Sequence, residues 1–134
     1  MDRYATHLQA LAWAAGRTEG PILELGAGWY STPMLAGLAE ATGRRLVTVE
    51  PSMVLPWPTV LPDEYEDLDW GLVLVDHEPT ERNEAIKRYR GATIVVHDTG
   101  PDTGYAYPGM MEALEEFPHR RDFTDLEPWT TVVW

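Results

Sequence analysis

The chain of 134 residues contains no cysteine, which excludes disulfide bonds, a thiolate nucleophile and cysteine-ligated zinc. Positive charge is scarce: 10 Lys and Arg stand against 22 Asp and Glu, for a formal net charge of −12. Because phosphate groups would be repelled, we expect neither nucleic acid nor an anionic membrane as the main partner. No apolar run approaches the roughly 20 residues of a membrane span, and the N-terminal region lacks the apolar block of a signal peptide. We therefore expect a cytoplasmic protein.

The length of the chain predicts one domain over residues 1–134, because 134 residues leave little room for a second hydrophobic core. Hydrophobic residues make up 44% of the chain, and six Trp and six Tyr add bulk. Six Trp are many for this length, so self-association into a homo-oligomer is an open expectation.

Short apolar segments alternate with helical ones. We expect strands at residues 21–25, 46–49, 72–75 and 92–96. Helices are expected over residues 3–15, from Ser31 or Thr32 to Gly43, over 80–90, and after Pro108, where Met111, Leu114 and Phe117 would be buried. The alternation predicts an α/β fold with a mostly parallel sheet and helices on both faces. Residues 121–124 and 130–134 predict an antiparallel hairpin at one edge.

Acidic residues fall at the ends of these strands. Glu24 lies near the end of the first, and Glu50, Asp76 and Asp98 each follow a later one. Ligands of open α/β sheets bind beyond the carboxyl ends of the strands, so we expect the four carboxylates around one crevice. Carboxylates held close together repel one another, so binding of a positively charged ligand or ion would be favourable there.

The segment 24–31 (Glu-Leu-Gly-Ala-Gly-Trp-Tyr-Ser) joins a strand to a helix. Its glycines allow a ligand to approach the backbone, and the helix start offers free N–H groups. Glu50 is placed to accept hydrogen bonds from ribose hydroxyls. The candidate cofactor-binding residues are Glu24, Gly26, Ala27, Gly28, Tyr30, Ser31, Glu50 and Asp76.

The charge near this loop discriminates between nucleotide ligands. Glu24 would repel the diphosphate of a nicotinamide dinucleotide, and Tyr30 and Ser31 replace the late glycine of dinucleotide folds. S-adenosylmethionine (SAM) has ribose hydroxyls, no phosphate, and both a sulfonium and an ammonium group. An acidic crevice with a glycine loop therefore suits SAM better.

At these residues the chain resembles the class I SAM-dependent methyltransferases. The E-x-G-x-G core is Glu24, Gly26 and Gly28, and the blocks 72–77 and 94–99 are similar to the matching strands of small family members. Over residues 20–100 the resemblance implies a Rossmann-like sheet and a methyl-donor pocket. The segment 51–70 is too short and proline-rich for a further strand–helix unit, so adenine recognition stays open, with Glu66, Asp67 or Asp69 as substitutes.

Asp76 and Asp98 also resemble the magnesium ligands of catechol-type O-methyltransferases, with Thr99 where an Asn is expected. That resemblance implies Mg²⁺ bound by Asp76 and Asp98, which would lower the pKa of a substrate hydroxyl. The alternative is that both carboxylates only fix their loops.

His77 and His97 follow strands beside acids, and they are candidate general bases because histidine titrates near neutral pH. The candidate catalytic residues are His77, His97 and Asp98, although either histidine could simply hydrogen-bond a neighbouring loop. His7 and His119 lack such a setting and are expected to be structural or exposed.

The sequence thus favours a SAM-dependent methyltransferase acting on a hydroxyl of a small-molecule substrate. Two alternatives stay open. One is a SAM-binding protein that transfers no methyl group, including an enzyme that degrades SAM. The other is an interaction module that reuses the fold.

Overall fold

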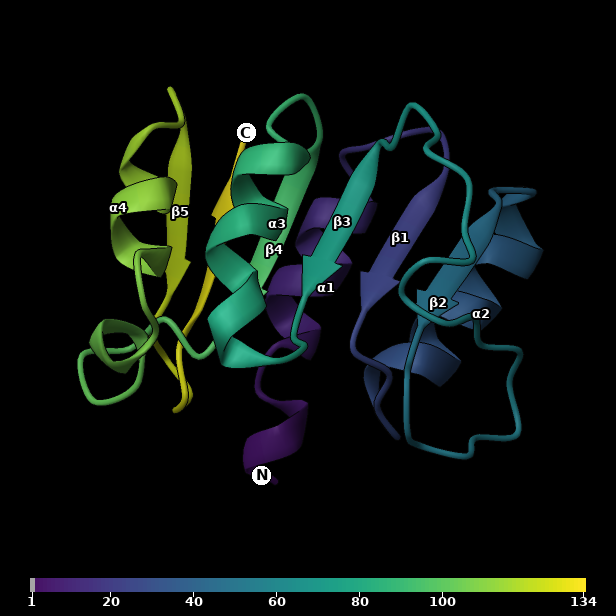
Figure 1. Ribbon diagram of the computed structural model, residues 1–134, viewed down its shortest axis with the longest axis horizontal. Coiled ribbons are helices and arrows are strands. Elements are labelled where there is room, and N and C mark those ends of the chain that lie inside the picture. The colour runs from purple at the N-terminus through teal and green to yellow at the C-terminus, as the bar shows by residue number, and fades with distance from the viewer. Residues whose placement is uncertain (1) are drawn as a thin grey trace.

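Six strands form one sheet in the order β2-β1-β3-β4-β6-β5 in the computed structural model, which describes residues 2–134 apart from the side chain of Tyr105 (Figure 1). The strands are β1 (Ile22–Leu25), β2 (Leu46–Val49), β3 (Leu72–Val75), β4 (Thr93–His97), β5 (Arg120–Phe123) and β6 (Thr130–Val133). The first four run parallel, and β6 is antiparallel to both β4 and β5. The predicted α/β class, the mostly parallel sheet and the C-terminal hairpin are confirmed.

Helices cover both faces of the sheet. They are α1 (Leu8–Ala15), α2 (Ser31–Thr42), α3 (Arg82–Arg88), α4 (Met110–Glu115) and the short 3-10 helices η1 (Arg3–Ala5), η2 (Pro79–Glu81) and η3 (Gly104–Ala106). Figure 1 shows α3 and α4 in front of the sheet and α1 and α2 behind it. Buried side chains accordingly form two cores, one against each pair of helices.

Strand β3 shows why the strands are almost entirely apolar. Val73 and Val75 point into the core beneath α3 and α4, whereas Leu72 and Leu74 point into the core beneath α1 and α2. A strand covered on both faces has no solvent side, so every position favours an apolar residue.

The order of the strands places a crevice at β1. The chain passes from β1 through α2 to β2 on one side, then returns to β3 on the other side of β1. Helices α2 and α3 therefore lie on opposite faces, and a gap opens beyond the carboxyl ends of β1 and β3. The N-terminal residues lie at this same edge of the sheet (Figure 1).

Local structure departs from the sequence predictions in four places. The helix predicted over residues 80–90 is a 3-10 turn, η2, followed by the shorter helix α3. The helix predicted over residues 3–15 is broken at Thr6 and His7, where both side chains turn into the molecule. The residue before α2 is Tyr30, so neither Ser31 nor Thr32 is its cap. Helix α4 begins at Met110, which is fully buried, whereas Met111, predicted to be buried, is only partly so.

Residues 51–70 follow the edge strand β2 as an irregular segment. Val60 forms an isolated parallel bridge to Val49, which gives β2 a partner on its outer side. Trp70 closes the segment and is buried in the core beneath α3 and α4. Within residues 2–134, no helix has both the length and the apolar character that a membrane crossing requires.

Candidate functional site

Two cavities lie at the carboxyl edge of the sheet, and residues of the loop after β1 contribute to both. The first, of about 650 Å³, is lined by Gly26, Glu50 and His77 among others. The second, of about 770 Å³, is lined by Gly28 and His97 among others. Asp76 lines both cavities, so its carboxylate marks the boundary between them.

Gly26 lets the loop cross closely over the end of β3. Its φ is +89°, and a Cβ at this position would lie 2.3 Å from the backbone oxygen of Asp76. A side chain is therefore excluded by both conformation and space. Gly28 is different, because a Cβ there would meet only the Ser31 hydroxyl at 3.4 Å. Gly26 is thus required by the fold. Gly28 is not required in this way, and because it has no side chain it occupies little space in the lining of the second cavity.

Glu24 does not reach the crevice, contrary to the prediction. It is 0% exposed, and its carboxylate accepts hydrogen bonds from three hydroxyls: Ser31 at 2.5 Å, Thr48 at 2.8 Å and Thr32 at 3.0 Å. Burial raises the pKa of Glu24, and the three hydroxyl donors oppose that rise. Since Gly28 N–H donates to Thr32, Glu24 holds the loop from behind rather than a ligand in front.

The same hydroxyls explain why α2 has no side-chain cap. Ser31 and Thr32 have hydroxyls of the kind that caps a helix, but both donate to Glu24. Ala27, Gly28, Tyr30 and Ser31 line the second cavity, whereas Gly26 and Glu50 line the first, so the predicted cofactor-binding residues are divided between the two cavities.

Glu50 lies on the wall of the first cavity, where the loop after β2 orients its carboxylate. Oε2 of Glu50 accepts from the backbone N–H groups of Ser52 at 3.0 Å and Met53 at 3.3 Å. One carboxylate oxygen is therefore fixed by the backbone, which aims the group as a hydrogen-bond acceptor.

The first cavity is strongly acidic. Among the described residues, its charged lining comprises five acids and one arginine: Glu50, Asp76, Glu78, Glu81, Glu84 and Arg88. Such a lining repels phosphate groups and attracts a ligand that carries positive charge.

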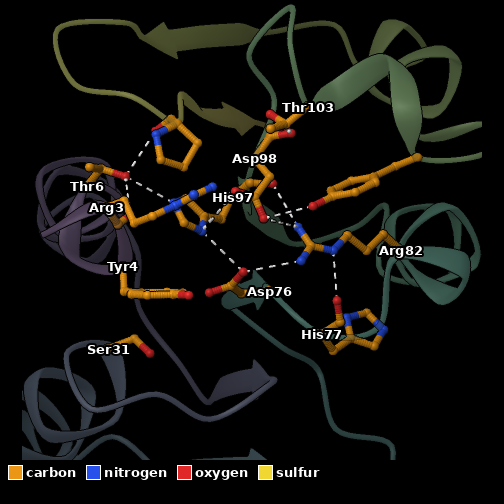
Figure 2. A network of polar contacts seen from close by, with 12 residues as sticks. Arg3, Tyr4, Thr6, Ser31, Asp76, His77, Arg82, His97, Asp98 and Thr103 are labelled. Atoms are coloured by element: carbon orange, nitrogen blue, oxygen red, sulfur yellow. Dashed lines mark hydrogen bonds and ion pairs between the residues drawn. The ribbon is translucent and has the colours of Figure 1, made fainter.

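Arg82, which sequence reasoning missed, is the centre of the polar cluster between the cavities (Figure 2). It is 4% exposed, and its guanidinium lies 3.3 Å from Oδ1 of Asp76 and 3.3 Å from Oδ2 of Asp98. It also donates to the backbone oxygens of His77 and His97, both at 2.9 Å. One buried cation thus joins the ends of β3 and β4 to α3.

This arrangement does not fit a magnesium ion shared by Asp76 and Asp98, because the Arg82 guanidinium already joins their carboxylates. Thr99, which stands where the catechol-type enzymes have an Asn, is turned away. It is buried, and its hydroxyl accepts a hydrogen bond from Thr131 of β6 at 2.8 Å. The expected Mg²⁺ therefore has no supporting geometry at these two carboxylates.

His97 and Asp98 lie on the wall of the second cavity. Nδ1 of His97 is 3.2 Å from Oδ1 of Asp76 and 3.7 Å from Oδ1 of Asp98. Asp98 has a φ of 62°, and Oδ2 of its carboxylate also accepts from the hydroxyl of Tyr107 at 3.1 Å. A left-handed conformation outside glycine is uncommon and gathers at functional positions.

His77 is separated from His97 by Arg82, so the two candidate bases do not act together (Figure 2). His77 lines the first cavity, and Nδ1 of its ring is buried without a partner among the described groups. Burial, helped by the charge of Arg82, lowers the pKa of His77 to about 4. A ring with so low a pKa is neutral at pH 7 and a weak base.

His7 is part of the site, although the sequence gave it no supporting setting. It is 2% exposed, lines the second cavity and lies edge-on to His97, with ring centroids 4.8 Å apart. Its helical spacing from Leu11 and Ala14, both fully buried, was the one available signal that it faces inward.

Comparison with known proteins supports the fold. Neither a family model nor a curated protein matches the sequence. Among solved structures, cofactor-bound Rv0187 from MTB is similar, with a TM-score of 0.64 and 18% sequence identity. The alignment covers 99% of this chain and 80% of Rv0187. At this identity the likeness establishes a shared Rossmann-like α/β fold.

Proposed function

We propose that the protein binds SAM and transfers its methyl group to a hydroxyl of a small molecule. The observation that carries the proposal is the acidic first cavity, which adjoins the glycine loop and holds five carboxylates against one arginine. A dinucleotide or nucleoside triphosphate would bring negative charge into this lining. SAM brings a nucleoside without phosphate and, when bound, supplies a methyl group on a positive sulfonium.

Glu50 would accept hydrogen bonds from the ribose hydroxyls, since backbone N–H groups already orient its carboxylate. Tyr65 and Tyr89 line the same cavity, and their hydroxyls are 2.6 Å apart. We assign the adenine ring to this wall, because flat bases pack well on aromatic side chains. Glu66 and Asp67, two of the acids considered for this role, instead pair with Arg45 and Arg88.

The boundary at Asp76 would then hold the sulfonium. Its carboxylate is common to both cavities, so a donor in the first cavity directs its methyl group toward the second. The acceptor would lie against His97 and Asp98, whose positions are fixed by Arg82. Holding donor and acceptor in line supplies most of the rate that such a displacement needs. Rv0187, which shares the fold, binds a cofactor, and this supports the proposal that the present chain binds one too.

Calorimetric titration with SAM, NAD and ATP tests the binding step. We expect SAM alone to bind, and Glu50→Ala to weaken its binding roughly 10- to 100-fold, as the loss of hydrogen bonds to a charged acceptor does. Glu64→Ala is the matched control, because Glu64 is an exposed acid of the same segment outside the cavity lining. Equal binding of ATP, or an unchanged affinity for SAM in Glu50→Ala, would contradict the proposal.

Product analysis after incubation with methyl-labelled SAM and a panel of small hydroxylated acceptors tests the transfer step. A labelled acceptor supports methyl transfer. Cleaved SAM would point to a SAM-degrading enzyme, and intact SAM that still binds would leave only a binding module, so both outcomes reject the transfer.

A further inference from the structure

Three side chains from separate parts of the chain converge at the floor of the second cavity. His7 precedes α1, Asp76 follows β3 and His97 ends β4. One ligand atom from each lies within 4.8 Å of the other two. Both histidines are buried, at 2% and 4% exposure, and all three side chains line the cavity.

His7 carries the first argument. Among the groups that the structure describes, which leave out the Tyr105 side chain, neither of its ring nitrogens has a hydrogen-bond partner, although both are buried. A buried polar atom without a partner costs free energy, and such an atom in a cavity wall is explained by a ligand. A neutral imidazole has one ring nitrogen with a lone pair, so an ion in the cavity would give His7 the partner that it lacks.

His97 carries the second argument, because its other nitrogen is already oriented. The Thr6 hydroxyl lies 3.1 Å from Nε2 of His97, and also within reach of the backbone oxygens of Arg3 at 3.1 Å and Pro128 at 3.0 Å (Figure 2). When the Thr6 proton is donated to either of these oxygens, the hydroxyl accepts from Nε2–H of His97. This leaves Nδ1 of His97 with a lone pair 3.2 Å from the Asp76 carboxylate. In this tautomer a cation shared by Nδ1 and the carboxylate stabilises the contact, and metal-binding histidines are usually oriented by a hydrogen bond at the other ring nitrogen.

Charge gives the third argument. The cluster contains two carboxylates, Asp76 and Asp98, and one guanidinium, Arg82, so one negative charge is unmatched when the imidazoles are neutral. Arg82 contacts only Oδ1 of Asp76, which fixes the carboxylate without covering it. Ligating carboxylates are usually held by such outer partners.

We propose that His7, Asp76 and His97 bind a divalent transition-metal ion of the Zn²⁺ type, with its open position facing the second cavity. Two imidazoles and one carboxylate suit Zn²⁺, Co²⁺ or Fe²⁺, whereas Mg²⁺ prefers oxygen ligands alone. Metal–ligand bonds of roughly 2.0–2.1 Å in a tetrahedral site place the ligand atoms roughly 3.4 Å from one another. The three ligand atoms already lie within 4.8 Å of one another, so modest side-chain rotations complete the site. The proposal goes beyond methyl transfer and does not require SAM to bind.

Titration of chelator-stripped protein with Zn²⁺ in excess Mg²⁺, without SAM, tests the site. We expect one equivalent of Zn²⁺ to bind. Loss of an outer partner of a metal site costs roughly 10- to 100-fold in affinity, so loss of a ligand in His7→Asn should cost at least about 100-fold. His119→Asn, which changes an exposed histidine far from the cavity, should bind as the wild type does. No binding by the wild type, or full binding by His7→Asn, overturns the proposal.

A second measurement uses only the unaltered protein, in case His7→Asn fails to fold. Titration with paramagnetic Co²⁺ should broaden the ring resonances of His7 and His97 before those of His119. Broadening that begins at His119, or equally at all histidines, would mean surface binding and overturn the proposal. Failure of SAM to bind would leave both outcomes unaffected.

Discussion

Arg82→Met should destabilise the protein strongly, because Arg82 is the one cation beside two carboxylates in the described cluster. Methionine keeps much of the length and apolar contact of the arginine stem but removes all its donors. Asp76 and Asp98 then lose the guanidinium that pairs with both carboxylates, and the backbone oxygens of His77 and His97 each lose a donor.

The magnitude follows from burial. Removing one partner of a buried ion pair costs about 3–5 kcal/mol. The side chains of Asp76 and Asp98 keep 24% and 17% exposure, so water can solvate them in part and the lower half of that range applies. With an unfolding entropy of about 2.1 cal/mol/K for each residue, a loss of about 3–4 kcal/mol lowers Tm by roughly 10–15 °C in a chain of this size.

Urea denaturation at pH 7, followed by tryptophan fluorescence and far-UV circular dichroism, measures the change. Arg88→Met is the control, because Arg88 lies on the same helix in an exposed pair with Asp67 and should cost about 1 kcal/mol or less. Adding Asp98→Asn to Arg82→Met should restore part of the loss if an unpaired charge is the cause. A loss below about 1 kcal/mol in Arg82→Met, or no recovery in the double variant, would refute this reasoning.

Two further predictions concern pH and backbone strain. Because burial holds the pKa of His77 at about 4, below its ordinary 6.5, the stability that its neutral ring contributes is complete above pH 6.5 and is lost as pH falls through 4. His77→Asn should therefore flatten the decline of unfolding free energy over that interval by up to about 3 kcal/mol, and an unchanged pH profile would contradict the assignment. Gly26→Ala should cost about 3 kcal/mol or more, because φ is +89° and the backbone oxygen of Asp76 blocks a Cβ. Gly37→Ala, with nothing within 4 Å, should instead stabilise α2 by about 0.5–1 kcal/mol, and similar effects of both substitutions in thermal unfolding would argue against the strain at Gly26.

The fold could be predicted because a strand that is buried on both faces is apolar at every position, and such a run is easily recognised in the sequence. Runs such as residues 72–75 and 94–96 are apolar at every position, and turn residues and helical spacing separate them. The hairpin was visible for the same reason, since residues 130–133 are buried. The break at Thr6 was not visible, because its cause is a hydrogen bond to Pro128, at the other end of the chain.

The site was predicted less completely, because position along a strand does not fix the direction of a side chain. Glu24 lies on the same face of β1 as Ile22, so it points beneath α2 and away from the crevice. Sequence placed Glu50, Asp76 and Asp98 at the correct edge, but it gave no sign that Arg82 joins two of them. Arg82 begins a helix and would ordinarily be solvated, and its burial depends wholly on tertiary partners.

The contacts of Thr6 span 91 residues to His97 and 122 to Pro128. Closing loops of that length is entropically costly, so the last wall of the second cavity forms only after the central strands and the terminal hairpin are in place. Native-state hydrogen exchange should accordingly find residues 3–7 opening at lower free energy than β3. Removing those residues, or crowding them with a fused tag, would leave a folded sheet with an unfinished pocket.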